Sequence, residues 1–140
     1  MKSTLLWTIA AAGLAWSACD SVTGSDDDNF TFTSSVVSFD SSMVDEATVG
    51  TQLRNLQIDG LFLLPHPCFE LIGDYRRTGG EILFTASAYA TDANCPAQAS
   101  AMQYRVSTFG MTRGTYRVTV YHNIAGTAPR VVTQTTVTTN

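Results

Sequence analysis

The sequence has little charge and almost no lysine. Charged residues make up 14% of its 140 residues, and Lys2 is the only lysine. The arginines are scattered, with a single adjacent pair at Arg76 and Arg77. A nucleic-acid-binding surface needs positive charge clustered on one face, so we expect no nucleic-acid partner. Hydrophobic residues still make up 44% of the chain, which is enough for a folded core and, at this length, predicts one domain at most.

Motifs of catalysis and of cofactor binding are also missing. The chain has no Gly-x-Ser-x-Gly motif, the turn that exposes the nucleophile of many hydrolases. Gly79-Gly80 is not followed by the lysine and the helix that a phosphate-binding loop needs. We therefore expect a non-catalytic protein without a cofactor. Glu70 and Glu81 could face each other as the carboxylate pair of a glycosidase, so a small hydrolase stays open as an alternative.

The apolar run near the N-terminus is too short to cross a membrane. It covers twelve residues, 5–16, and a helix of that length rises about 18 Å, against the ~30 Å of a bilayer core. Lys2 precedes the run, and the small residues Ser17 and Ala18 follow it, directly before Cys19. This order of charge, apolar core and small residues predicts an export signal.

The residues at the end of this signal resemble a known motif. Ala15-Trp16-Ser17-Ala18-Cys19 resembles the lipobox of bacterial lipoproteins, although Trp16 stands where such motifs hold an aliphatic residue. The resemblance implies that Cys19 is acylated by fatty acids and becomes the first residue of the mature protein. The chain would then be attached to a membrane of the bacterial cell envelope by its lipid anchor. An ordinary cleaved secretory signal and an uncleaved anchor helix are the alternatives.

An acidic segment separates this signal from the rest of the chain. Between residues 20 and 59 there are eight carboxylates against one arginine, Arg54. Residues 20–29 contain almost nothing that a core could bury, which is typical of a flexible linker. The sequence thus predicts a signal peptide at residues 1–18, a flexible acidic tether at 19–35 and a folded domain at 36–140.

Three cysteines occur in the chain, at positions 19, 68 and 95. If Cys19 is acylated, Cys68 and Cys95 remain, and in an oxidising compartment they are expected to form a disulfide. The loop-closure entropy of such a bridge corresponds to about 3.5 kcal/mol. A metal site that uses both cysteines with His66 and His122 is the competing hypothesis, but the spacing matches no common zinc pattern.

From residue 36 onward, apolar and polar residues alternate with the period of β-strands. The clearest strand is residues 115–122, where Tyr116, Val118 and Val120 are expected to face inward. Residues 81–90 and 102–108 alternate in the same way, and Thr78-Gly79-Gly80 predicts a hairpin that pairs residues 68–77 with 81–90.

The two ends of the domain have weaker patterns. The segment 130–138 is dense in Val and Thr and predicts a final edge strand. Early strands are expected at 35–39 and 52–63, and residues 42–47 could start a helical turn.

Six or seven short antiparallel strands with a cross-linked pair of cysteines predict an all-β protein with an immunoglobulin-like β-sandwich. The stretch from Gly110 to Val120 also resembles the penultimate strand of bacterial Ig-like accessory domains, in which a glycine-led turn precedes a Tyr-x-Val-x-Val strand. A small closed β-barrel is the alternative, since the same alternation fills a barrel.

The predicted function is a structural or binding role at the cell envelope, with an envelope protein or a glycan as the partner. Tyr and Arg dominate contact energies in many interfaces. The alternation places several of them on outward faces, and the candidate binding residues are Arg105, Arg117 and Tyr121, with Tyr75 and Tyr89 as further outward tyrosines. A metal-binding envelope protein and a small envelope hydrolase are the alternative functions.

Overall fold

The structure is a computed structural model that describes residues 30–140. The predicted signal peptide, the predicted acylation site Cys19 and the first part of the predicted tether lie outside the described residues. Among residues 30–140, no helix is long and apolar enough to span a membrane.

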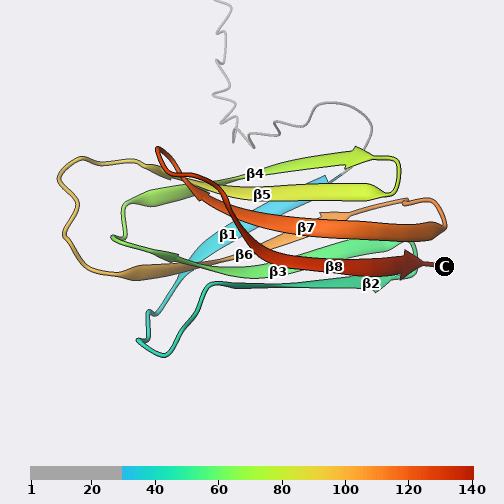
Figure 1. The fold of residues 1–140 in the computed structure, drawn as a ribbon. Helices are drawn as coiled ribbons and strands as arrows, with labels where there is room; N and C mark the ends of the chain where they lie inside the picture. Colours follow the sequence, from blue (N-terminus) through green and yellow to red (C-terminus); the bar gives the residue numbers. More distant parts are fainter. Residues whose placement is uncertain (1–29) are drawn as a thin grey trace, which may run out of the picture.

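The described residues form eight strands in two sheets that pack face to face (Figure 1). Sheet A has the order β1-β6-β3-β2, and sheet B has the order β4-β5-β7-β8. The predicted β-sandwich is confirmed, and the strands of residues 30–140 do not close into a barrel. The strands are β1 (Phe30–Val37), β2 (Glu46–Gln52), β3 (Asn55–Leu64), β4 (Phe69–Thr78), β5 (Glu81–Ala90), β6 (Ser100–Thr108), β7 (Gly114–Ile124) and β8 (Arg130–Thr139).

The strand order has one feature that a purely antiparallel sandwich lacks. β5 and β7 are parallel neighbours, whereas every other pair is antiparallel. The cause is the path of the chain: after β5 it crosses to sheet A, forms β6 and returns to sheet B as β7, so that β5 and β7 run in the same direction. The order also differs from the A-B-E-D and C-F-G grouping of the immunoglobulin fold.

The N-terminal part of the domain departs from the sequence prediction. β1 begins at Phe30, inside the segment expected to be tether, because the rings of Phe30 and Phe32 reach the opposite sheet. The ring centroid of Phe30 lies 5.7 Å from that of Tyr75, and the ring centroid of Phe32 lies 6.0 Å from that of Phe84. The helical turn considered at residues 42–47 does not form; β2 begins there at Glu46 and pairs with β3.

The strand expected at 52–63 begins at Asn55, because residues 53–54 form the turn between β2 and β3, and the domain has eight strands and not six or seven. The later part of the strand prediction agrees with the structure. The 78–80 hairpin joins β4 to β5, residues 81–90 form β5, and β8 is the edge strand of sheet B. Tyr116, Val118 and Val120 are buried as expected. The prediction for Tyr75 is wrong, because it placed the side chain outward and the residue is only 6% exposed. Tyr75 lies on the same face of β4 as the buried Leu71.

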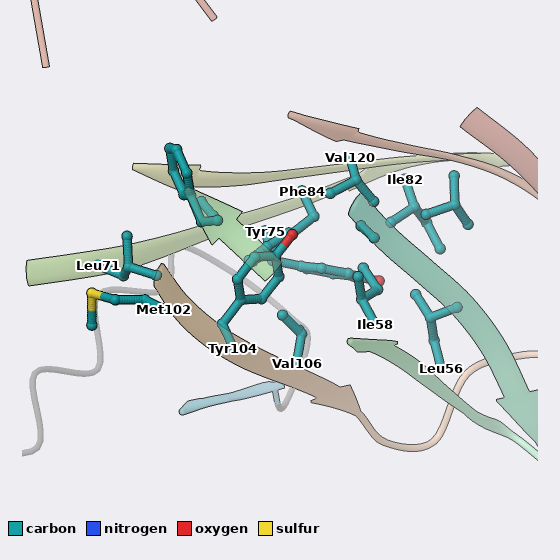
Figure 2. Close-up of a cluster of buried hydrophobic side chains, with 14 of the residues drawn as sticks. Leu56, Ile58, Leu71, Tyr75, Ile82, Phe84, Met102, Tyr104, Val106 and Val120 are labelled. Carbon is teal, nitrogen blue, oxygen red and sulfur yellow. The ribbon is translucent and has the colours of Figure 1, made fainter. Parts of the chain in front are cut away.

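The core lies between the two sheets, and both contribute to it (Figure 2). Gly60 of β3 lies opposite Tyr104 of β6, and the tyrosine ring occupies the space that a Cβ at position 60 would need, 2.1 Å from its Cζ. Glycine is therefore required at position 60. The labelled side chains of Figure 2 that meet between the sheets are Leu56, Ile58, Leu71, Tyr75, Ile82, Phe84, Met102, Tyr104, Val106 and Val120.

Candidate functional site

The candidate binding residues Arg105, Arg117 and Tyr121 do not form one surface. Arg105 belongs to β6 in sheet A, whereas Arg117 and Tyr121 belong to β7 in sheet B. Both arginines are exposed on the outer faces of their sheets, and Arg117 Nη1 lies 3.7 Å from Glu81 Oε1. A ligand that contacts Arg105 therefore meets a different face of the sandwich from one that contacts Arg117.

A groove surrounds Arg105 on sheet A. Its volume is about 570 Å³, and its lining presents polar and apolar surface in similar amounts, with polar side chains from Thr33, Ser35, Glu46, Thr48, Asp59, Gln103 and Arg105. The sequence prediction missed it because it assigned residues 30–35 to the tether, so Thr33 and Ser35 were not placed on a strand.

An ion pair between β6 and β3 lines the groove. Arg105 Nε donates to Asp59 Oδ1 at 2.6 Å, and Gln57 Nε2 donates to Asp59 Oδ2 at 2.5 Å. Partial burial acts to raise the pKa of Asp59, but the hydrogen bonds from Gln57 and Arg105 outweigh it and hold this pKa below its ordinary value. The carboxylate is thus ionised at neutral pH and fixes the direction of the guanidinium group.

The predicted disulfide is present. Cys68 and Cys95 are bonded, with an S–S distance of 2.02 Å and a Cα–Cα distance of 5.8 Å. Cys68 ends the connection from β3 to β4, and Cys95 lies in the connection from β5 to β6. Both connections run between the two sheets, so the bridge fastens the two crossings of the chain to each other at one end of the sandwich.

One of the two histidines lies beside this bridge. A ring nitrogen of His66 and the Sγ atoms of Cys68 and Cys95 all lie within 4.8 Å of one another. The His66 ring stacks on Phe69, with a centroid distance of 4.3 Å, and its Nδ1 is buried without a hydrogen-bond partner. His122, the other histidine of the competing metal-site hypothesis, is not part of this cluster.

His122 is instead the centre of a buried polar network. Its Nε2 forms a hydrogen bond of 2.8 Å with the Tyr104 hydroxyl, and its Nδ1 lies 3.7 Å from Asp45 Oδ1. Asp45 also pairs with Arg130 of β8 and accepts a hydrogen bond of 2.5 Å from the Leu63 amide. Burial lowers the pKa of His122 from 6.5 to about 4 and raises the pKa of Tyr104.

This network has the acid, imidazole and hydroxyl order of a hydrolase triad, but a substrate has no access to it. His122 is 2% exposed and Tyr104 is 3% exposed. A tyrosine with a raised pKa is also a poor nucleophile. We therefore assign the network a structural role, in which the Tyr104 hydroxyl and His122 Nε2 satisfy each other inside the core.

The carboxylates considered for a glycosidase do not meet. Glu81 is the first residue of β5, and Glu70 is opposite Tyr89 near the other end of that strand. Eight residues of strand separate the two positions, which corresponds to about 25 Å. Glycosidase carboxylates lie roughly 5–10 Å apart, so the expected pair is not formed.

Comparison with protein-family models, with curated proteins and with solved structures finds no match for this chain.

Proposed function

We propose that this chain is a non-catalytic lipoprotein of the bacterial cell envelope, fastened to the membrane through Cys19. In this proposal the β-sandwich is a binding module, and the groove around Arg105 is its site for a glycan of the envelope. The proposal combines a location, which depends on the cysteines, with a task, which depends on the groove.

The observation that carries the location is the disulfide between Cys68 and Cys95. Stable disulfides are typical of exported proteins and rare in the cytosol. The bridge also uses two of the three cysteines in the chain, which leaves Cys19 as the one available for acylation. Its place after a charge, an apolar run and two small residues fits the same function.

The polar side chains of the groove support a glycan as the ligand. Hydroxyl, amide, carboxylate and guanidinium groups offer both donors and acceptors at short spacing, as the hydroxyls of a sugar require. The volume of about 570 Å³ lies within the range of small-ligand sites, roughly 300–1,000 Å³. The Arg105–Asp59 pair provides a fixed charge-assisted donor in the groove.

Intact mass spectrometry of the membrane-extracted protein tests the location. We expect a loss of residues 1–18, an added mass of fatty acids and the absence of two hydrogens because of the bridge. Cys19→Ala should abolish the added mass and release the protein from the membrane fraction. A Cys68→Ser/Cys95→Ser variant is the control and should still be acylated. Unmodified, water-soluble wild-type protein would refute the anchor.

Calorimetric titration with soluble fragments of envelope polysaccharides tests the groove. We expect Arg105→Ala to weaken binding at least tenfold, because it removes the charge-assisted donor of the site. Arg117→Ala is the matched control, since it removes an equally exposed arginine from the opposite outer face. If no fragment binds, or if the two variants weaken binding equally, the groove is not a glycan site.

A further inference from the structure

The cluster of His66, Cys68 and Cys95 has more ligand capacity than a disulfide uses. Two sulfur atoms and one ring nitrogen lie within 4.8 Å of one another, although the residues come from two different connections of the chain. Thiolate and imidazole are the ligands that Zn²⁺ and Cu⁺ prefer. The buried Nδ1 of His66 has no hydrogen-bond partner, so this side chain is left with an unsatisfied polar atom that neither the disulfide nor the proposed function explains.

We propose that reduction of the Cys68–Cys95 disulfide opens a binding site for a thiophilic d¹⁰ metal ion, with both sulfurs and His66 as ligands. The oxidised protein has a structural cross-link at this position, and the reduced protein holds a metal ion there. The cluster is then a redox-controlled metal site, which goes beyond the proposed function of the groove.

The chemical step is a thiol–disulfide exchange. A dithiol reductant attacks the S–S bond, which breaks, and the two electrons and two protons of the dithiol pass to Cys68 and Cys95 while the reductant becomes a disulfide. A Zn²⁺ ion then replaces the two thiol protons, which are released to solvent, and the neutral His66 ring donates its nitrogen lone pair. Zinc bound in this way keeps a fourth position for water.

The movement that the ion requires is small. A tetrahedral zinc ion with Zn–S bonds of about 2.3 Å holds its sulfurs about 3.8 Å apart. Bonded sulfurs in any disulfide are about 2.0 Å apart, so each has to move by about 1 Å, which a change in side-chain torsion provides.

Contacts other than the disulfide keep the two connections together. The Thr91 amide donates to the Cys68 carbonyl oxygen at 2.9 Å, and Ser100 Oγ donates to the His66 carbonyl oxygen at 2.9 Å. Pro65 and Pro67 restrict the backbone on both sides of His66. The three ligands are therefore expected to stay close when the bridge is reduced.

The test uses the full chain with Cys19→Ala, so that Cys68 and Cys95 are its only thiols. The protein is reduced with a phosphine, freed of reductant and titrated with Co²⁺ as a spectroscopic probe and then with Zn²⁺. We expect one equivalent of Co²⁺ to give a thiolate-to-metal charge-transfer band, and Zn²⁺ to displace it. The disulfide form should give no band.

Two variants separate this site from general metal binding. His66→Ala should weaken Zn²⁺ binding at least tenfold, because it removes one of the three ligands. Asp92→Asn, which removes an exposed carboxylate from the same connection as Cys95, should bind as the wild type does. Circular dichroism at each step measures whether the reduced domain stays folded.

Three outcomes would overturn the proposal. The first is a reduced protein that gives no thiolate band, whether it stays folded or unfolds without recovery when metal is added. The second is equal binding by His66→Ala and the parent chain. The third is equal binding by the oxidised and reduced proteins.

Discussion

The stability of this domain should depend on pH through His122. Burial lowers the pKa of His122 from 6.5 to about 4 in the folded state, whereas in the unfolded chain it should be close to 6.5. Below pH 6.5 His122 binds a proton in the unfolded chain, whereas in the folded protein it binds one only near pH 4. The free energy of unfolding contributed by this side chain is therefore present above pH 6.5, and it is lost as the pH falls toward 4.

The size of the loss follows from the shift of the pKa. The shift from 6.5 to about 4 at 1.36 kcal/mol for each pKa unit corresponds to about 3 kcal/mol. The groups that face His122 are Tyr104, Asp45 and, through Asp45, Arg130. Asp45 by itself would favour a charged His122. Its carboxylate is already paired with Arg130, and its Oδ1 lies 3.7 Å from His122 Nδ1. Burial therefore has a stronger effect on the pKa of His122 than the charge of Asp45 has.

Urea denaturation at pH 7, 6, 5 and 4 measures this loss. His122→Gln is the comparison, because it keeps a polar group that can reach the Tyr104 hydroxyl but does not titrate. The variant has no titrating group at position 122, so the wild type should lose about 3 kcal/mol more than the variant between pH 7 and pH 4. Parallel pH curves for the two proteins, or an NMR titration of His122 with a midpoint at 6.5 or above, would refute the reasoning.

Three further substitutions test the fold. Cys68→Ser/Cys95→Ser should lower the free energy of unfolding by about 3.5 kcal/mol, because the bridge closes a loop across a sequence separation of 27 residues; a change below 1 kcal/mol in urea denaturation would contradict this. Gly60→Ala should lower the free energy of unfolding by roughly 2–3 kcal/mol, because the added methyl group clashes with the Tyr104 ring. Gly50→Ala is the control, since a Cβ there meets nothing within 4 Å, and it should be neutral or stabilising when both variants are compared by thermal denaturation. Phe84→Ala, at a fully buried position, should cost about 3–5 kcal/mol, and a midpoint shift of only a degree or two would place Phe84 outside the core.

The sequence predicted the strands whose pattern is strong. In β5 and β7 a period of two continues over eight or more residues, and one face is apolar enough to indicate the core directly. The 78–80 hairpin was predictable because glycine allows the turn that it needs, and Gly79 has a φ of 59°. The disulfide was predictable from the number of cysteines and the expected export.

What the sequence could not provide are relations between distant residues. The Phe-x-Phe pattern at 30–32 is too short to outweigh its polar surroundings, so residues 30–35 of β1 were assigned to the tether. The alternation of β4 places Tyr75 on the face of Leu71 and away from Asp74, but the prediction did not use this alternation; the stacking of Tyr75 against Phe30 in the opposite sheet was not visible from the sequence. The groove and the partly buried position of Asp45 beside His122 likewise arise only when strands from different parts of the chain come together.

The position of β6 determines how this protein can be made. β6 lies between β1 and β3 in sheet A, although it is sixth along the chain. The N-terminal strand therefore has no neighbour within its sheet until about three quarters of the polypeptide has emerged, and β7 cannot take its parallel place before that crossing is complete. Fragments that stop short of residue 100 should fail to fold and should be cleared by proteases. A chain of this topology is expected to fold in one cooperative step, and only after β6 is available.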